Sequence, residues 1–157
     1  MPDLQLERDD RFEARERVLH RIAVTVMTLG VLAGAAGLLG SGPLATTTRA
    51  GDGFRVTYER FARNGAPLQL QVESSDGGGD QVWIDDTLLE AARVERVIPA
   101  AAAERRRSAG VQFSFEPLAG AGAAVTFNLT GDTIGLVRGR AGRSPTDAVP
   151  VSILLYP

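Results

Sequence analysis

Residues Ile22–Leu39 read IAVTVMTLGVLAGAAGLL, a run without a charged or strongly polar side chain. At a rise of about 1.5 Å per residue, a helix of this length spans roughly 27 Å, close to the hydrocarbon thickness of a bilayer. The run therefore predicts a transmembrane helix over residues 22–41. The alternative is the buried helix of a soluble protein, but the remainder of the chain reads as strands and offers no helical bundle to bury it.

The residues before this run favour an uncleaved signal-anchor over a cleaved signal peptide. Residues 1–21 are long for a signal-peptide n-region and contain six acidic residues. They also contain five arginines, against three within a similar distance after the run. This bias predicts that residues 1–21 are a charged cytoplasmic tail and that the C-terminal domain lies outside the membrane. Whether the N-terminal segment is cleaved stays open at this point.

Small residues recur along one side of the predicted helix. They form a stripe with a spacing of three to four residues that contains a GxxxG pair: Gly30, Gly34, Gly37 and Ser41. Such a stripe lets a second helix approach closely, which makes it a candidate interface with another copy of the chain or with another membrane protein. The alternative is that a Gly- and Ala-rich composition simply fills the span with small residues.

Composition narrows the classes of function. The formal net charge is −2 over 157 residues, which provides no general basic field for binding nucleic acid. All 17 basic residues are arginine, and this bias, with abundant Ala and Gly, indicates a GC-rich bacterial coding sequence. The expected location is therefore the bacterial inner (cytoplasmic) membrane, with a single pass. The absence of cysteine excludes disulfides and thiol chemistry.

After a linker predicted over residues 42–53, residues 54–157 read as short strands separated by turns. In Phe54–Tyr58 and Leu68–Val72, for example, apolar residues alternate with polar ones, which is typical of half-buried strands. Seven or eight such strands predict an extracytoplasmic antiparallel β-sandwich of immunoglobulin-like type. The expected core is apolar: Val56, Tyr58, Leu68, Leu70, Val72, Ile84, Val94, Val111, Phe113, Phe115, Val125, Phe127, Leu129, Ile134, Val151 and Ile153.

The predicted outer domain lacks the residues of common active sites. It contains no His, Cys or Lys, which excludes Ser-His-Asp and Cys-His catalysis, Schiff bases and ordinary zinc sites. Asp85 and Asp86 are adjacent, so on a strand they would point to opposite faces rather than form a catalytic pair. Asp76 and Asp80 flank three glycines and could bind Ca²⁺, although a solvated loop is the simpler interpretation. We expect no enzyme activity, cofactor or metal.

Two arginine-rich segments are candidates for contact with an anion or a partner. They contribute Arg105, Arg106, Arg107, Arg138, Arg140 and Arg143. Such groups can bind lipid headgroups, anionic polymers or an acidic protein surface. The alternative is that they are solvated loop residues balanced by nearby acids.

Three short stretches extend this interpretation to most of the chain. They are Gly40–Leu44 after the apolar run, Val56–Phe61 (VTYERF) and the terminal Tyr156-Pro157. Together they resemble a group of uncharacterised bacterial single-pass membrane proteins with an extracytoplasmic β-sandwich-like domain. The resemblance implies the same architecture. The function expected from all these features is a non-enzymatic, membrane-anchored accessory or scaffold protein, and the alternative is an extracytoplasmic ligand-binding or sensing module.

Overall fold

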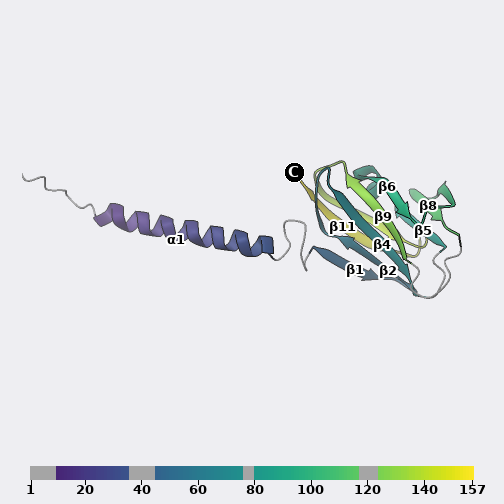
Figure 1. Cartoon of the computed structure of the whole chain (residues 1–157), viewed down its shortest axis with the longest axis horizontal. Coiled ribbons are helices and arrows are strands. Elements are labelled where there is room, and N and C mark those ends of the chain that lie inside the picture. Colours follow the sequence, from purple (N-terminus) through teal and green to yellow (C-terminus); the bar gives the residue numbers. More distant parts are fainter. Residues whose placement is uncertain (1–9, 36–44, 76–79, 117–123) are drawn as a thin grey trace, which may run out of the picture.

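The computed structural model describes residues 10–35, 45–75, 80–116 and 124–157. A single long helix, α1 (Asp10–Ala33), is followed by a domain of two β-sheets packed face to face (Figure 1). The fold is therefore mainly β, and its two layers are those of a β-sandwich. The first strand of the domain belongs to one sheet and the last strand to the other.

Helix α1 joins residues that the sequence divides between two predicted segments. Its first half, Asp10–Arg21, comes from the predicted charged tail, and its second half comes from the apolar run. In the described part of the chain, no helix combines the length and the apolar character needed to cross a membrane. The predicted transmembrane helix of residues 22–41 extends beyond α1, and its residues 36–41 lie outside the described residues.

The first layer is a five-stranded antiparallel sheet with the order β1-β2-β4-β9-β6. Its central strands alternate strictly, because one face packs into the core while the other meets solvent. At its edge, β1 pairs with β2 over Thr46↔Glu59 to Ala50↔Arg55. The bounds are β1 Thr46–Ala50, β2 Phe54–Glu59, β4 Pro67–Ser74, β6 Ala92–Ile98 and β9 Ala124–Gly131.

The second layer is a six-stranded sheet with the order β3-β11-β10-β5-β8-β7. All its pairs are antiparallel except β3 with β11, which run parallel. Strand β10 pairs with β5 only at Ala141 and Gly142, so the first half of β10 has a free edge. The bounds are β3 Phe61–Arg63, β5 Gln81–Asp85, β7 Ala103–Arg106, β8 Gly110–Ser114, β10 Gly135–Gly142 and β11 Ala148–Tyr156.

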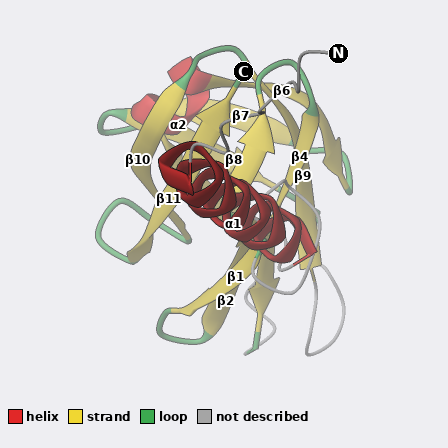
Figure 2. Cartoon of the chain, turned by 90° about the vertical axis from the view of Figure 1, so that its left-hand side faces the viewer, coloured by secondary structure: helices red, strands yellow, loops and turns green. Residues whose placement is uncertain are grey.

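A short helix, α2 (Asp86–Ala91), carries the chain from the second sheet to the first and lies beside β10 (Figure 2). The Asp85 side chain caps it by accepting a hydrogen bond from the Thr87 backbone N–H at 2.7 Å. Leu88 of α2 is buried directly over Gly139 of β10, where a Cβ atom would approach its Cγ within 2.5 Å.

The core lies between the two sheets and is centred on Phe127 of β9. Its ring meets Phe113 of β8 edge-on at a centroid distance of 5.1 Å and Phe115 at 6.5 Å, which joins the two layers through aromatic contacts. Most of the predicted core residues are buried in this way. The exceptions are Val94 and Val111, which are partly buried at the margin, and Ile134, which is 59% exposed.

The structure corrects the predicted number of strands. The described residues form eleven strands in a five-plus-six arrangement, not the seven or eight of an immunoglobulin-like sandwich, whose constant-type sheets have four and three strands. The strands expected from the sequence are all present. The additional strands are β1, β3 and β7, which lie at sheet edges.

These three strands were not predicted because they are very short or lack the large apolar residues that mark the others. Strand β1 (TTTRA) has no large apolar residue and occupies part of the segment predicted as a linker over residues 42–53, so the sandwich begins earlier than residue 54. Strand β7 (AERR) is exposed throughout, and β3 has only three residues. Edge strands need one pairing partner and little burial, which leaves a weak trace in the sequence.

Candidate functional site

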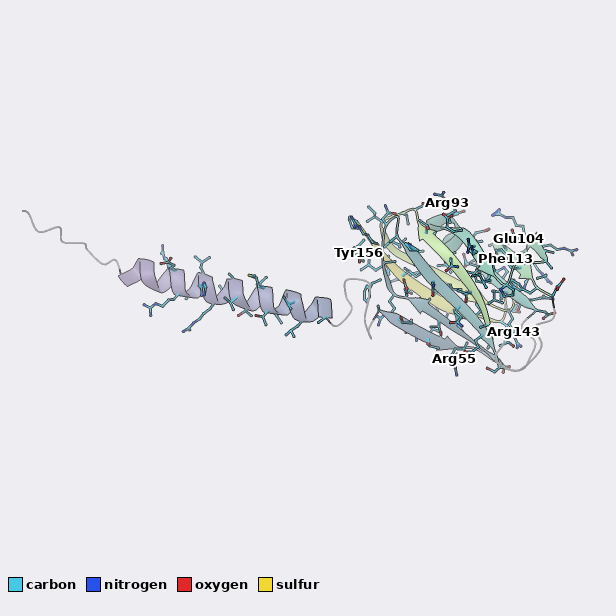
Figure 3. The ribbon with its side chains drawn as sticks, in the orientation of Figure 1. Arg55, Arg93, Glu104, Phe113, Arg143 and Tyr156 are labelled. Carbon is cyan, nitrogen blue, oxygen red and sulfur yellow. The ribbon has the colours of Figure 1, made fainter. Side chains whose placement is uncertain are left out.

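Helix α1 is the first candidate site because its apolar side chains are exposed. They project from all sides of the helix (Figure 3), and the exposed set is Val18, Leu19, Ile22, Val24, Val26, Met27, Leu29, Val31 and Leu32. Exposed apolar surface of this extent is typical of a segment that contacts lipid or another protein. Within this helix, the Thr28 hydroxyl donates a hydrogen bond to the Val24 carbonyl oxygen at 2.8 Å.

The predicted helix–helix interface is described only in part. Gly30 lies within α1, and a Cβ atom added there would meet nothing within 4 Å. Gly34 directly follows the last residue of α1. Gly37 and Ser41 lie outside the described residues. The open space beside Gly30 is compatible with the close approach of a second helix.

The six candidate arginines do not form one site, and Arg143 belongs to the framework of the fold. Its guanidinium donates to the Asp52 carbonyl oxygen at 2.7 Å, pairs with the Asp147 carboxylate at 3.1 Å and lies 5.7 Å from the centroid of the Phe54 ring. It thereby ties the β1–β2 turn of the first sheet to the β10–β11 connection of the second. We call this end of the sandwich the Asp52 end.

The arginines around β7 lie apart from those of β10, with β5 and β8 between them. Arg106 pairs with Asp86 at 2.9 Å and so holds β7 to the start of α2. Arg107 contributes its backbone, because its carbonyl oxygen accepts the Trp83 indole N–H at 3.0 Å and its N–H donates to Gly110. Arg105 is exposed and lies opposite Gln112 in the register. This segment is a structured hairpin, in which β7 pairs with β8, rather than a solvated loop.

Arg138 and Arg140 remain as candidates on the outer face of β10. Opposite them on β11 are Ser152 and Pro150. Arg140 donates to the Ala148 carbonyl oxygen at 3.1 Å, and among the described residues neither arginine forms a salt bridge. An arginine without a carboxylate partner on a sheet face is available to an external anion.

The structure places apolar residues beside these arginines that sequence reasoning missed. Phe61, Leu154 and Leu136 lie in register across β3, β11 and β10, and Ile134 lies two residues before Leu136. We call these four residues the outer patch. Ile134 and Leu136 are 59% and 55% exposed, and they line a shallow depression of about 580 Å³ between β10 and α2. A clue in the sequence was the pair Leu136-Val137, which places apolar side chains on both faces of β10.

The adjacent acids Asp85 and Asp86 have structural partners. Asp85 caps α2, and Asp86 pairs with Arg106. Asp76 of the loop considered for Ca²⁺ binding lies outside the described residues, whereas Asp80 is described. Within the ranges that the structure covers, no three His, Asp or Glu residues are grouped so that they could hold a metal ion.

The surroundings of Glu59 and of Arg93 shift the pKa values of these two side chains. Partial burial raises the pKa of the Glu59 carboxyl, which lies at the end of β2. The pKa of Arg93 is raised by its hydrogen bonds to Asp132 and then by the charges of Asp132 and Glu95. Arg93 donates twice at 3.0 Å and once at 3.2 Å to the Asp132 carboxylate, which links β6 to the turn before β10. Both effects belong to the framework of the domain.

Comparison of the sequence with protein-family models and with curated proteins finds no match to either. The candidate site is therefore defined by its geometry: a helix with exposed apolar side chains, and a sheet face on which an apolar patch lies beside two arginines that form no salt bridge within the described residues.

Proposed function

We propose that this protein is a non-enzymatic accessory or scaffold protein of the bacterial inner membrane. In this proposal, α1 and the apolar residues after it form a single-pass anchor with the N-terminus inside. The sandwich lies outside, and the anchor associates with another membrane protein or with a second copy of the chain. The resemblance to single-pass membrane proteins described above implies the same architecture.

The observation that carries the proposal is the exposure of the apolar side chains of α1. Each such residue left in water costs the free energy that burial would otherwise release, about 1.5–3 kcal/mol for a large aliphatic side chain. Nine exposed residues of this kind favour a location in lipid or against another helix. The Thr28 hydroxyl supports this location because its own donor is bonded within the helix, as an apolar medium requires.

The association face is proposed to contain Gly30 and Gly34. These residues lie four apart and thus on one face of a helix, and the space beside Gly30 is open. Thr28 points to the other side, because two positions along a helix correspond to a rotation of about 200°. Bulk added at Gly30 should therefore block a second helix, while similar bulk at Thr28 should not.

The test is purification of the tagged full-length protein from its host membrane in a gentle detergent, followed by mass spectrometry of associated proteins. For the wild-type protein, we expect either a stoichiometric membrane partner or a homodimer. Gly30→Leu combined with Gly34→Leu should reduce the associated protein at least about tenfold, which corresponds to roughly 1.4 kcal/mol. The matched control, Thr28→Leu, should keep the association.

Two results would contradict the proposal. One is equal recovery of the partner with the glycine variant and the threonine control, which would remove the small-residue face from the interface. The other is release of the wild-type protein from membranes by salt or carbonate washing, which would show that the chain is not anchored. Thermal unfolding of the sandwich should be unchanged in both variants.

A further inference from the structure

The outer face of β3, β11 and β10 has a single sign of charge. The outward positions of these strands include the apolar residues Phe61, Leu154 and Leu136 and the three arginines Arg63, Arg138 and Arg140. None of the outward positions is acidic. An exposed apolar patch on strands whose outward charges are all positive is suited to a surface that is anionic at its boundary and apolar beneath it.

This face lies where the chain arrives from α1. The Arg60 N–H donates to the Ala45 carbonyl oxygen at 2.6 Å, and the Leu154 N–H donates to the Arg60 carbonyl oxygen at 2.7 Å. The first residue of the described domain and the centre of the outer patch are thus joined by two successive hydrogen bonds. We call this end of the sandwich the Ala45 end; it also contains Tyr156, which lies on the side nearest α1 in Figure 3.

The connection to α1 limits how far the outer patch can move from the helix. Ala45 follows Ala33, the last residue of α1, by twelve positions. At about 3.5 Å per residue, a fully extended chain of that length covers at most roughly 42 Å. A surface held within this distance of a membrane meets the bilayer at a high effective concentration. Even a weak affinity for lipid is then enough to keep the surface bound.

We propose that the outer patch docks on the anionic headgroups of the bilayer that holds α1, with Ile134, Leu136 and Leu154 entering the headgroup boundary. Arg63 and Arg138 bind lipid phosphates. The Arg60 guanidinium lies over the Phe61 ring, 5.6 Å from its centroid, at the margin of the patch. The inference rests on the proposed membrane attachment. It adds that the sandwich lies against the membrane by its Ala45 end rather than moving freely on a tether.

The experiment uses the natural absence of cysteine, which makes any introduced cysteine unique. Full-length protein is reconstituted in phosphatidylcholine vesicles with or without phosphatidylglycerol, and a nitroxide is attached at one site. Ser152→Cys reports on the outer face next to the patch without altering it, and Gln71→Cys is the control on the outer face of β4. Val26→Cys reports on α1. Accessibility to oxygen and to a water-soluble nickel chelate gives the depth of each label.

We expect the Ser152 label to lose nickel accessibility in vesicles that contain phosphatidylglycerol, while the Gln71 label stays aqueous in both. Replacing one arginine, by Arg63→Gln or Arg138→Gln, should weaken docking about fivefold, and raised salt should do the same. Leu136→Ser with Leu154→Ser should abolish docking, with thermal unfolding measured to confirm that the domain is folded.

The outcomes separate the two proposals. A Val26 label in the bilayer with an aqueous Ser152 label in both lipids would overturn the docking and keep the anchor. Protection of Ser152 that is equal in both lipids and grows with protein concentration would indicate contact between copies and would also overturn it. A Val26 label that remains aqueous would overturn the proposed anchor and, with it, docking on the bilayer that holds α1, whatever the Ser152 label reports.

Discussion

The two faces of β11 contain similar residues in opposite surroundings. Ile153 points into the core and is 2% exposed, whereas its neighbour Leu154 points outward and is 39% exposed. The same contrast appears on β10 between Val137 and Leu136. Apolar residues on the inner face are explained by folding, because burial is what stabilises the sandwich. Those on the outer face contribute little to folding, so their presence is better explained by contact with another surface.

The largest effect is expected from truncation on the inner face. Ile153→Ala removes buried methyl and methylene groups and leaves a cavity between the sheets, which should lower the free energy of unfolding by about 2–5 kcal/mol. Chemical denaturation of the full-length protein, followed by the fluorescence of Trp83, measures the change. A loss below about 1 kcal/mol would mean that the inner face of β11 is not packed as the structure describes.

An intermediate effect is expected at the Asp52 end, where a polar tie joins the two sheets. Arg143→Ala removes the bonds to the Asp52 carbonyl and the Asp147 carboxylate and should cost about 1–2 kcal/mol. Arg96→Ala is the control, because Arg96 is exposed on β6 and has no salt bridge among the described residues. Equal melting temperatures for the two variants would show that Arg143 does not hold the sheets together.

A small effect on stability is expected on the outer face of β11. Leu154→Ala should change the free energy of unfolding by no more than about 0.5 kcal/mol, because the side chain is already partly solvated. Compared with Ile153→Ala in the same denaturation assay, it gives a direct measure of the contrast between the faces. If the two variants were equally destabilised, the outer patch would be part of the folding core and its role as a contact surface would lose its main support.

The smallest effect concerns Glu59, whose raised pKa makes its contribution to the stability of the folded domain depend on pH. The charged form is disfavoured in the folded state, so the free energy of unfolding should increase as pH falls through the folded pKa towards the ordinary value of 4.5. Glu59→Gln should remove this dependence and raise stability at pH 7 by less than about 0.5 kcal/mol, because the site is partly solvated. Melting temperatures between pH 4 and pH 7 test it, and a variant that melts lower at pH 7 would contradict the assignment.

Much of the sandwich could be predicted from the sequence because β4 and β9 alternate without interruption. Ile134 shows where this reasoning fails. It was assigned to the core as the first apolar residue of a strand, but β10 turns Val137 and Ala141 inward instead. The inner face of β10 has small residues because α2 inserts Leu88 over Gly139, and this packing between distant segments has no signature in the local pattern.

The candidate sites could likewise be predicted from the sequence only in part. The exposed apolar side chains of α1 follow from composition, and sequence alone identified Arg138 and Arg140 as basic residues of interest. Their apolar neighbours could not be found from sequence, because Phe61 joins the surface only through the parallel pairing of β3 with β11, more than ninety positions later. Arg143 was assigned to the same group, and its bonds within the fold could only be identified from the tertiary structure.

The length of the strands gives the sandwich a height. Strands β4 and β9 have eight residues each, and at about 3.3 Å per residue they separate the Ala45 end from the Asp52 end by roughly 25 Å. If the Ala45 end rests on the bilayer as proposed, the turns closed by Arg143 stand that far above it. A protein that contacts those turns must itself project to the same level, which restricts such partners to proteins with a substantial domain outside the membrane.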